Sequence, residues 1–212
     1  MNLDTLSFLI AILIGITIHE FSHAWMANFL GDPTAKYAGR LSLNPLRHLD
    51  PFGTVILLFL IFTTGLGFGW GKPVPVNPYN LRYRYGELLV SLAGPFSNFL
   101  LSILLILLIA VLPPSITNTW SSSFLRLIQS VVSVNIMLGL FNLIPVPPLD
   151  GSKVLFDLLP PGQHTIKSNL EKFGPFLLIF FFFFGLGILG NLARLVIFSL
   201  YNLSSLINNI LY

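Results

Sequence analysis

The sequence predicts an all-α membrane protein, a polytopic bundle of about four to six transmembrane helices that forms a single domain over residues 1–212. Hydrophobic residues make up 54% of the chain and charged residues only 9%, whereas a soluble domain carries about 25% charged residues. Several apolar stretches also approach or exceed the roughly 20 residues that a helix needs to cross a bilayer. We therefore expect the lipid bilayer to be the environment of the whole chain.

The distribution of charge predicts how the chain crosses the membrane. Fifteen of the 19 charged residues lie in segments 32–50, 72–87 and 150–172, whereas the link 113–123 has none. Because cytoplasmic loops are rich in Lys and Arg, the three charged segments should face the cytoplasm and the link should face out. The predicted spans are residues 5–28, 88–112, 124–144 and 173–189.

Two further segments have a less certain path. Residues 52–71 are apolar, but a full crossing would move the basic residues of 72–87 to the outside. We therefore expect a re-entrant element at about 52–80, which could include a β-hairpin, because Gly65, Gly67, Gly69 and Gly71 interrupt a short helix. A fifth crossing is the alternative. Residues 190–212 form an amphipathic helix that either lies at the interface or adds a last span.

A metal-binding motif lies inside the first span. His19, Glu20 and His23 form H-E-x-x-H. Residues four apart share one face of a helix, so both imidazoles can bind one metal ion while Glu20 takes a proton from its water. Such a short pattern often occurs by chance on soluble surfaces, but ionisable groups within a membrane segment are costly without a partner. The depth of the motif favours a metal.

A catalytic zinc site needs a third protein ligand, and Asp150 is the favoured candidate. It follows Asn142-Leu-Ile-Pro-Val-Pro-Pro-Leu149, where the prolines prevent the third span from continuing as a helix. Asp150 could instead cap a helix that begins at Ser152. His48 and Asp50 compete for the ligand role, although a loop histidine bonded to the backbone is the simpler interpretation of His48.

These motifs together resemble those of the site-2 protease family, the intramembrane zinc metalloproteases. The resemblance rests on HEFSH in the first span, SLAGPFSN in the second and FNLIPVPPLDG at the end of the third. The segments GRLSLNP and GWGKPVPVNP resemble the small members of the family, which lack PDZ and CBS domains. The similarity runs from about residue 16 to about residue 155.

The resemblance implies a zinc-dependent endopeptidase that cuts peptide bonds in or near transmembrane segments of membrane proteins. It assigns one Zn²⁺ per chain to His19, His23 and Asp150, general base and acid catalysis to Glu20, and a transition-state contact to Asn142. Asn142 could equally make an interhelical hydrogen bond, as expected for Asn98 and Asn135. The expected location is the cell membrane, with the active site toward the cytoplasm.

The partners follow from composition as well as from the resemblance. The partner is a transmembrane segment of a protein substrate, and a net charge of +3 without a basic run argues against nucleic acid. The absence of cysteine excludes disulfides, thiolate ligands and cysteine nucleophiles.

The segment around Lys72, Val74 and Val76 is a candidate substrate-binding element. In an extended Gly71-Lys-Pro-Val-Pro-Val76, the two prolines remove N–H donors from one edge only, so the other edge can pair with an unwound substrate. An ordinary proline-rich turn is the alternative.

Two other classes of function remain to be distinguished from a protease. A membrane metal-ion transporter would need ligands stepping across the bilayer, but apart from Glu20 no span carries a mid-depth carboxylate. An inactive relative that binds membrane helices would have no use for Glu20.

Overall fold

The computed structural model describes residues 3–64, 67, 69–160 and 162–212 and confirms the all-α class, since these residues contain no β-strand. Among the described residues, four helices are long and apolar enough to cross a membrane: α1 (Leu3–Phe29), α4 (Gly86–Val111), α6 (Ser122–Asn142) and α9 (Leu186–Leu211). The remaining elements are α2 (Thr34–Tyr37), η1 (Pro45–Arg47), α3 (Pro51–Thr64), η2 (Pro78–Asn80), α5 (Pro114–Thr117), α7 (Asp150–Leu158) and α8 (His164–Phe184).

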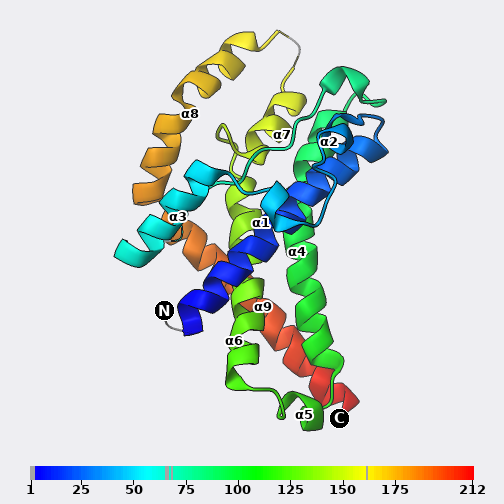
Figure 1. Ribbon diagram of the computed structural model, residues 1–212, viewed down its shortest axis with the longest axis vertical. Helices are drawn as coiled ribbons and strands as arrows, with labels where there is room; N and C mark the ends of the chain where they lie inside the picture. The colour runs from blue at the N-terminus through cyan, green and yellow to red at the C-terminus, as the bar shows by residue number, and fades with distance from the viewer. Residues whose placement is uncertain (1–2, 65–66, 68, 161) are drawn as a thin grey trace.

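Helices α1, α4 and α6 pack against one another, and α9 crosses α4 and α6 (Figure 1). Apolar residues at helical spacing form the contact between α1 and α6, with Ala11 and Ile12 against Val131 and Val134. Gly15 allows close approach, because a Cβ there would lie 2.7 Å from Leu138 Cδ1. This close packing lets Asn98 on α4 form hydrogen bonds to Gly15 on α1 and to Asn135 on α6.

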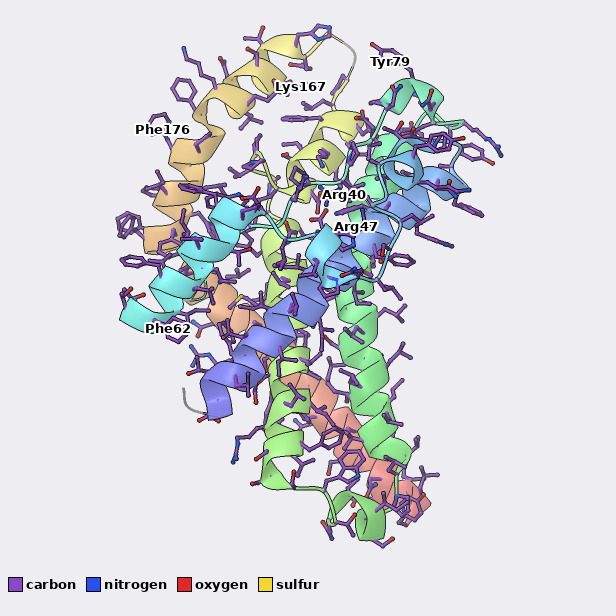
Figure 2. All side chains as sticks on the ribbon, in the orientation of Figure 1. Arg40, Arg47, Phe62, Tyr79, Lys167 and Phe176 are labelled. Atoms are coloured by element: carbon purple, nitrogen blue, oxygen red, sulfur yellow. The ribbon has the colours of Figure 1, made fainter. Side chains whose placement is uncertain are left out.

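The predicted separation of the charged segments is visible in Figure 1, where α2, α7 and the connection from α3 to α4 lie at one end of the molecule. Helix α5 and the C-terminus lie at the opposite end. Tyr79 and Lys167, labelled in Figure 2, also lie at the first end. We call this the charged end.

The prediction of a span at 173–189 is wrong. Residues 173–184 form the second half of α8, whose first half is charged, and a new helix begins at Leu186. Twelve apolar residues extend only about 18 Å, which is too short for a bilayer core of about 30 Å. The last described helix that is long and apolar enough to span the membrane is α9, the alternative considered for 190–212. Asn208 Nδ2 on α9 donates to the carbonyls of Ala110 and Leu112 at the end of α4.

The segment 52–71 leaves and returns at the same end of the molecule, which is the predicted re-entrant path. Leu49 and Gly71 form an isolated antiparallel bridge, so the two ends of the segment meet. Helix α3 has 14 residues, about 21 Å, and cannot cross the bilayer. The β-hairpin is absent from the described residues, because a helix and this single bridge take its place. Gly65 lies outside the described residues.

Candidate metal centre

Helix α1 places two imidazoles of the H-E-x-x-H motif against each other. The Nε2 atoms of His19 and His23 lie 3.0 Å apart, and both residues are buried, with exposures of 6% and 7%. This is the arrangement that a spacing of four residues predicts on a helix. Helix α4 lies directly behind the rings, since a Cβ on Gly94 would lie 2.4 Å from His23 Nε2.

Asp150 reaches the two imidazoles from the first residue of α7. Its Oδ2 lies 3.0 Å from His19 Nε2 and 3.1 Å from His23 Nε2. The start of α7 packs onto the end of α6, because a Cβ on Gly151 would lie 2.3 Å from the carbonyl oxygen of Leu143. The N-cap position of α7 is Leu149, and the printed partners of the Asp150 carboxylate are His19, His23 and Lys153 and not a backbone N–H of its own helix. Within the described part of the chain, these three residues form the one cluster suited to a metal ion.

The outer ring nitrogens of both histidines have fixed partners. His19 Nδ1 lies 2.6 Å from Asn98 Oδ1, and His23 Nδ1 lies 2.7 Å from the carbonyl oxygen of Val90. Asn98 Nδ2 donates to Gly15 O at 3.1 Å and to Asn135 Oδ1 at 2.7 Å. Asn98 must therefore present its oxygen to His19, and both histidines must donate from Nδ1.

This proton arrangement leaves three acceptors facing one another. With Nδ1 protonated, the neutral form of each imidazole presents a bare lone pair at Nε2, and ionised Asp150 adds a third acceptor within 3.1 Å. Three acceptors at this distance repel unless a cation lies between them. Two neutral imidazoles and one carboxylate are also a common donor set of catalytic zinc, so the residues fit a zinc ion.

Asp150 is held in its ionised form. Burial alone would raise its pKa, but the facing His23 and His19, when their imidazoles are protonated, lower the pKa well below the ordinary range through charge and hydrogen bonds. Lys153 Nζ lies 3.4 Å from the second oxygen, Oδ1. At the other end of α7, Asp157 Oδ2 accepts from the backbone N–H of Leu88 at 2.8 Å, which anchors α7 to the start of α4. The ligand is thus supported from two helices.

Glu20 is half-buried and lies beside the returning segment at Gly71. A Cβ on Gly71 would lie 3.6 Å from Glu20 Oε1 and 3.0 Å from Ile16 Cγ2. A side chain at position 71 would therefore crowd the carboxylate that lies between His19 and His23 in the sequence. The backbone that follows Gly71 is the candidate substrate-binding segment.

The segment 72–77 has no regular secondary structure and is anchored at both ends. Lys72 N donates to His48 O at 2.8 Å, and Asn77 N donates to Asp32 Oδ2 at 2.7 Å. Between these anchors the N–H groups of Val74 and Val76 have no hydrogen-bond partner among the described residues. Lys72 is exposed, whereas Val76 packs against α1 and α4.

A comparison with known proteins identifies the family. YwhC of Bacillus subtilis is 39% identical over 169 residues, which cover 78% of this chain and 74% of YwhC. The model of Peptidase family M50 matches residues 113–185. The chain belongs to peptidase family M50, the site-2 protease family.

Other similar proteins are less identical, and the matched residues cover a smaller share of their length. Rip2 of Mycolicibacterium smegmatis is 34% identical over 165 residues, covering 76% of this chain and 61% of Rip2. MJ0392 of Methanocaldococcus jannaschii is 25% identical over 179 residues, covering 84% of this chain and 42% of MJ0392. The names of all three relatives include the words zinc metalloprotease. No solved structure matches the chain. As a member of this family, the chain is an intramembrane zinc protease.

The competing ligands lie outside the cluster of this M50 protein. His48 is fully buried, and its Nε2 lies 2.6 Å from Ser42 O, which matches the interpretation as a loop histidine bonded to the backbone. Asp50 Oδ1 accepts from Gly53 N at 2.8 Å and caps α3. Asn142 is half-buried at the end of α6, where its Nδ2 donates to Leu138 O at 3.0 Å.

Asn98 is the functional contact that the sequence interpretation missed. Asn98 and Asn135 were expected to join helices, and their hydrogen bond across α4 and α6 confirms this. The bond from Asn98 to His19 was not expected. The sequence did hold a sign of this bond. Histidines that bind a metal donate their second ring nitrogen to a buried acceptor, and Asn98 lies in a span rich in small residues. In the structure Asn98 is fully buried.

Proposed function

We propose that His19, His23 and Asp150 hold a single zinc ion and that Glu20 is the general base and acid of peptide hydrolysis. The observation that carries this assignment is the convergence of three acceptor atoms within 3.1 Å. When bound, zinc supplies a Lewis acid that polarises the scissile carbonyl and makes water acidic enough to attack near neutral pH. Glu20 takes the proton that the attacking water loses and returns it to the leaving amine.

The surrounding residues orient these groups. Asn98 and the Val90 carbonyl accept from Nδ1 of the two histidines, so both Nε2 lone pairs stay directed at the ion. Asn142 uses one of its two amide hydrogens for Leu138 O. The second hydrogen can stabilise the oxyanion that develops on the scissile carbonyl.

The substrate is a transmembrane segment of a membrane protein, held extended by strand addition. A helical peptide bond is shielded by its own hydrogen bonds, so the substrate must unwind near the site. The free N–H groups of Val74 and Val76 lie on a segment fixed at Lys72 and Asn77. They can accept an unwound strand without a change in the protein backbone.

The cell membrane is the location that fits this function. Segments rich in Lys and Arg lie at the charged end, and so does α7, which begins with Asp150. By the positive-inside rule, the charged end faces the cytoplasm and α5 faces out. Peptides are therefore cut near the cytoplasmic surface.

The substitution Glu20→Gln tests the protease against the transporter and the inactive relative. Cleavage of a membrane-spanning reporter should fall at least about a hundredfold, because general base catalysis contributes 10²–10⁴, while zinc content stays unchanged. Glu171→Gln, at the charged end on α8, is the matched control. Zinc flux into vesicles that survives Glu20→Gln would support a transporter, and absence of cleavage in the unmodified protein would support an inactive relative.

A further inference from the structure

A groove of about 660 Å³ runs along the membrane-embedded part of the protein between α1 and α6. Its other walls come from α3 and from the junction of α8 and α9, and α3 and α8 both lie on one side of the bundle in Figure 1. Phe62 and Phe176, labelled in Figure 2, mark the outer edges of these two helices. Most of the lining is apolar, so the groove is suited to an apolar occupant.

The α1 side of the groove leads to the catalytic base. The lining residues Asp4, Phe8, Ile12 and Ile16 are spaced by four, and each such step turns a helix only about 40° past a full turn. The next step along this row is Glu20. Gly71 lies beside both Ile16 Cγ2 and Glu20 Oε1, at 3.0 and 3.6 Å from the position of a Cβ. Glu20 therefore lies one helical turn beyond the last groove residue on α1, Ile16.

The α6 side of the groove carries Arg126, which pairs with Asp4 of α1 at 3.5 Å, and three uncharged polar side chains, Gln129, Ser130 and Ser133. None of the three uncharged side chains has a hydrogen-bond partner among the described residues. Hydroxyls elsewhere in the apolar helices bond back to the carbonyl four residues earlier, as Ser22 and Ser102 do. Ser133 lies nine residues before the end of α6 at Asn142, about 14 Å along the axis and thus near mid-membrane.

We propose that this groove docks the transmembrane segment of the substrate and selects a segment with one uncharged hydrogen-bonding side chain near its middle. Asn, Gln, Ser or Thr in the substrate would pair with Gln129, Ser130 and Ser133, which otherwise leave polar atoms without partners in an apolar environment. The rest of the segment lies against the apolar lining. Its end toward the charged end is delivered to Glu20. This inference rests on the proposed protease function.

Photocrosslinking with two synthetic peptides tests the proposal without requiring hydrolysis. The probes are Leu/Ala transmembrane peptides of about 20 residues that carry photoleucine and either Asn or Leu at the centre. They are mixed with Glu20→Gln protein in phosphatidylcholine vesicles. We expect crosslinks to α1 and α6 residues such as Phe8 and Met137. The Asn peptide should give about threefold to tenfold higher yield, as expected for one or two interhelical hydrogen bonds.

Substitutions in the groove test whether its polar side chains recognise the central Asn of the peptide or whether the groove only contacts the peptide. The combined change Gln129→Leu, Ser130→Ala and Ser133→Ala should abolish the preference for Asn and retain crosslinking of the Leu peptide. Ser199→Ala on α9, whose hydroxyl bonds only to Leu195 O, should leave the preference unchanged. Equal yields for the two peptides with unmodified groove residues, or crosslinks concentrated on the C-terminal half of α9, away from the lining residues Leu186 and Leu189, would overturn the proposal. The proposal would also be overturned if neither peptide crosslinked to the groove because the vesicle lipid occupies it.

These experiments distinguish a failure of the docking inference from a failure of the proposed protease function. If the unmodified protein binds the Asn peptide in the groove but cuts no membrane protein, the docking inference stands and the protease function fails. If the protein cuts a reporter and the groove variants cut it with unchanged KM, the protease function stands and the docking inference fails.

Discussion

Asn98 Oδ1 accepts the Nδ1 proton of His19 across 2.6 Å, although the two residues are 79 positions apart in the chain. This contact fixes which nitrogen of His19 faces Asp150. Because Asn98 also donates to α1 and α6, one amide contributes both to the orientation of a proposed metal ligand and to the packing of three helices. Removing it should therefore affect metal binding as well as stability.

The substitution Asn98→Ala should lower zinc affinity about 10- to 100-fold, the range for loss of a hydrogen bond to a metal-binding histidine. The measurement is competition with a chelator on detergent-purified protein. Ser102→Ala is the matched control, since Ser102 is buried one turn further along α4 and bonds to Asn98 O and Val132 O but not to a ligand. Equal losses of affinity in the two variants would show that the effect is only structural.

Gly94 should tolerate no side chain, because a Cβ there would lie 2.4 Å from His23 Nε2 and 2.7 Å from His19 Cε1. We expect Gly94→Ala to separate the imidazoles from α4 and to reduce bound zinc more than tenfold, while the helix content measured by circular dichroism is retained. Ser97→Ala removes only a hydroxyl that bonds to Gly94 O and should bind zinc normally. Full zinc occupancy in Gly94→Ala would contradict the geometry described for the site.

Proline at position 74 should abolish cleavage without loss of zinc. Val74→Pro removes an N–H that has no partner within the described protein, so folding should be unaffected while strand addition loses a hydrogen bond. Pro75→Ala is the control, since it leaves the N–H groups of Val74 and Val76 intact. Normal cleavage by the Val74→Pro variant would rule out pairing along this edge.

Asp32 should make the anchoring of the segment 72–77 dependent on pH. Burial raises the pKa of its carboxyl, but hydrogen bonds from Thr34, Asn80 and Asn77 outweigh this and lower the pKa below the ordinary value. A lowered pKa in the folded state stabilises the protein at pH values above the unfolded pKa of about 3.9, and this contribution is lost as pH falls through the folded pKa.

Hydrogen exchange of the Asn77 amide measures this effect. In the unmodified protein its protection should be constant from pH 7 to about 5, after correction for intrinsic exchange, and should decline at lower pH. Asp32→Asn should show weaker protection at pH 7 and a flatter profile. Identical profiles for the two proteins would remove Asp32 as the anchor.

The fold class and the paired histidines followed from local rules. A spacing of four residues places His19 and His23 on one face of any helix, and three prolines before Asp150 predict a break that frees the third ligand. Long-range contacts could not be predicted in this way. The partner of His19 depends on how α4 rotates against α1, and the need for glycine at position 94 follows from the same packing.

The error in the fourth span has a physical cause as well. The phenylalanine-rich residues 173–184 are apolar enough for a span, but the chain turns at Gly185 before they reach the required length. The polar residues of 190–212 favoured an interfacial helix. In the structure Asn208 meets the free carbonyls at the end of α4, so a helix with polar residues packs as the last span.

The most direct test of the account is the zinc content per chain of detergent-purified protein, compared with that of His23→Ala and Asp150→Ala. The account predicts close to one zinc in the unmodified protein and a clear loss in both variants, because both residues supply a ligand to the same ion. Asp150→Ala that retained a full zinc ion would contradict the link between α1 and α7. Folded, unmodified protein that binds no zinc would contradict the metal centre itself.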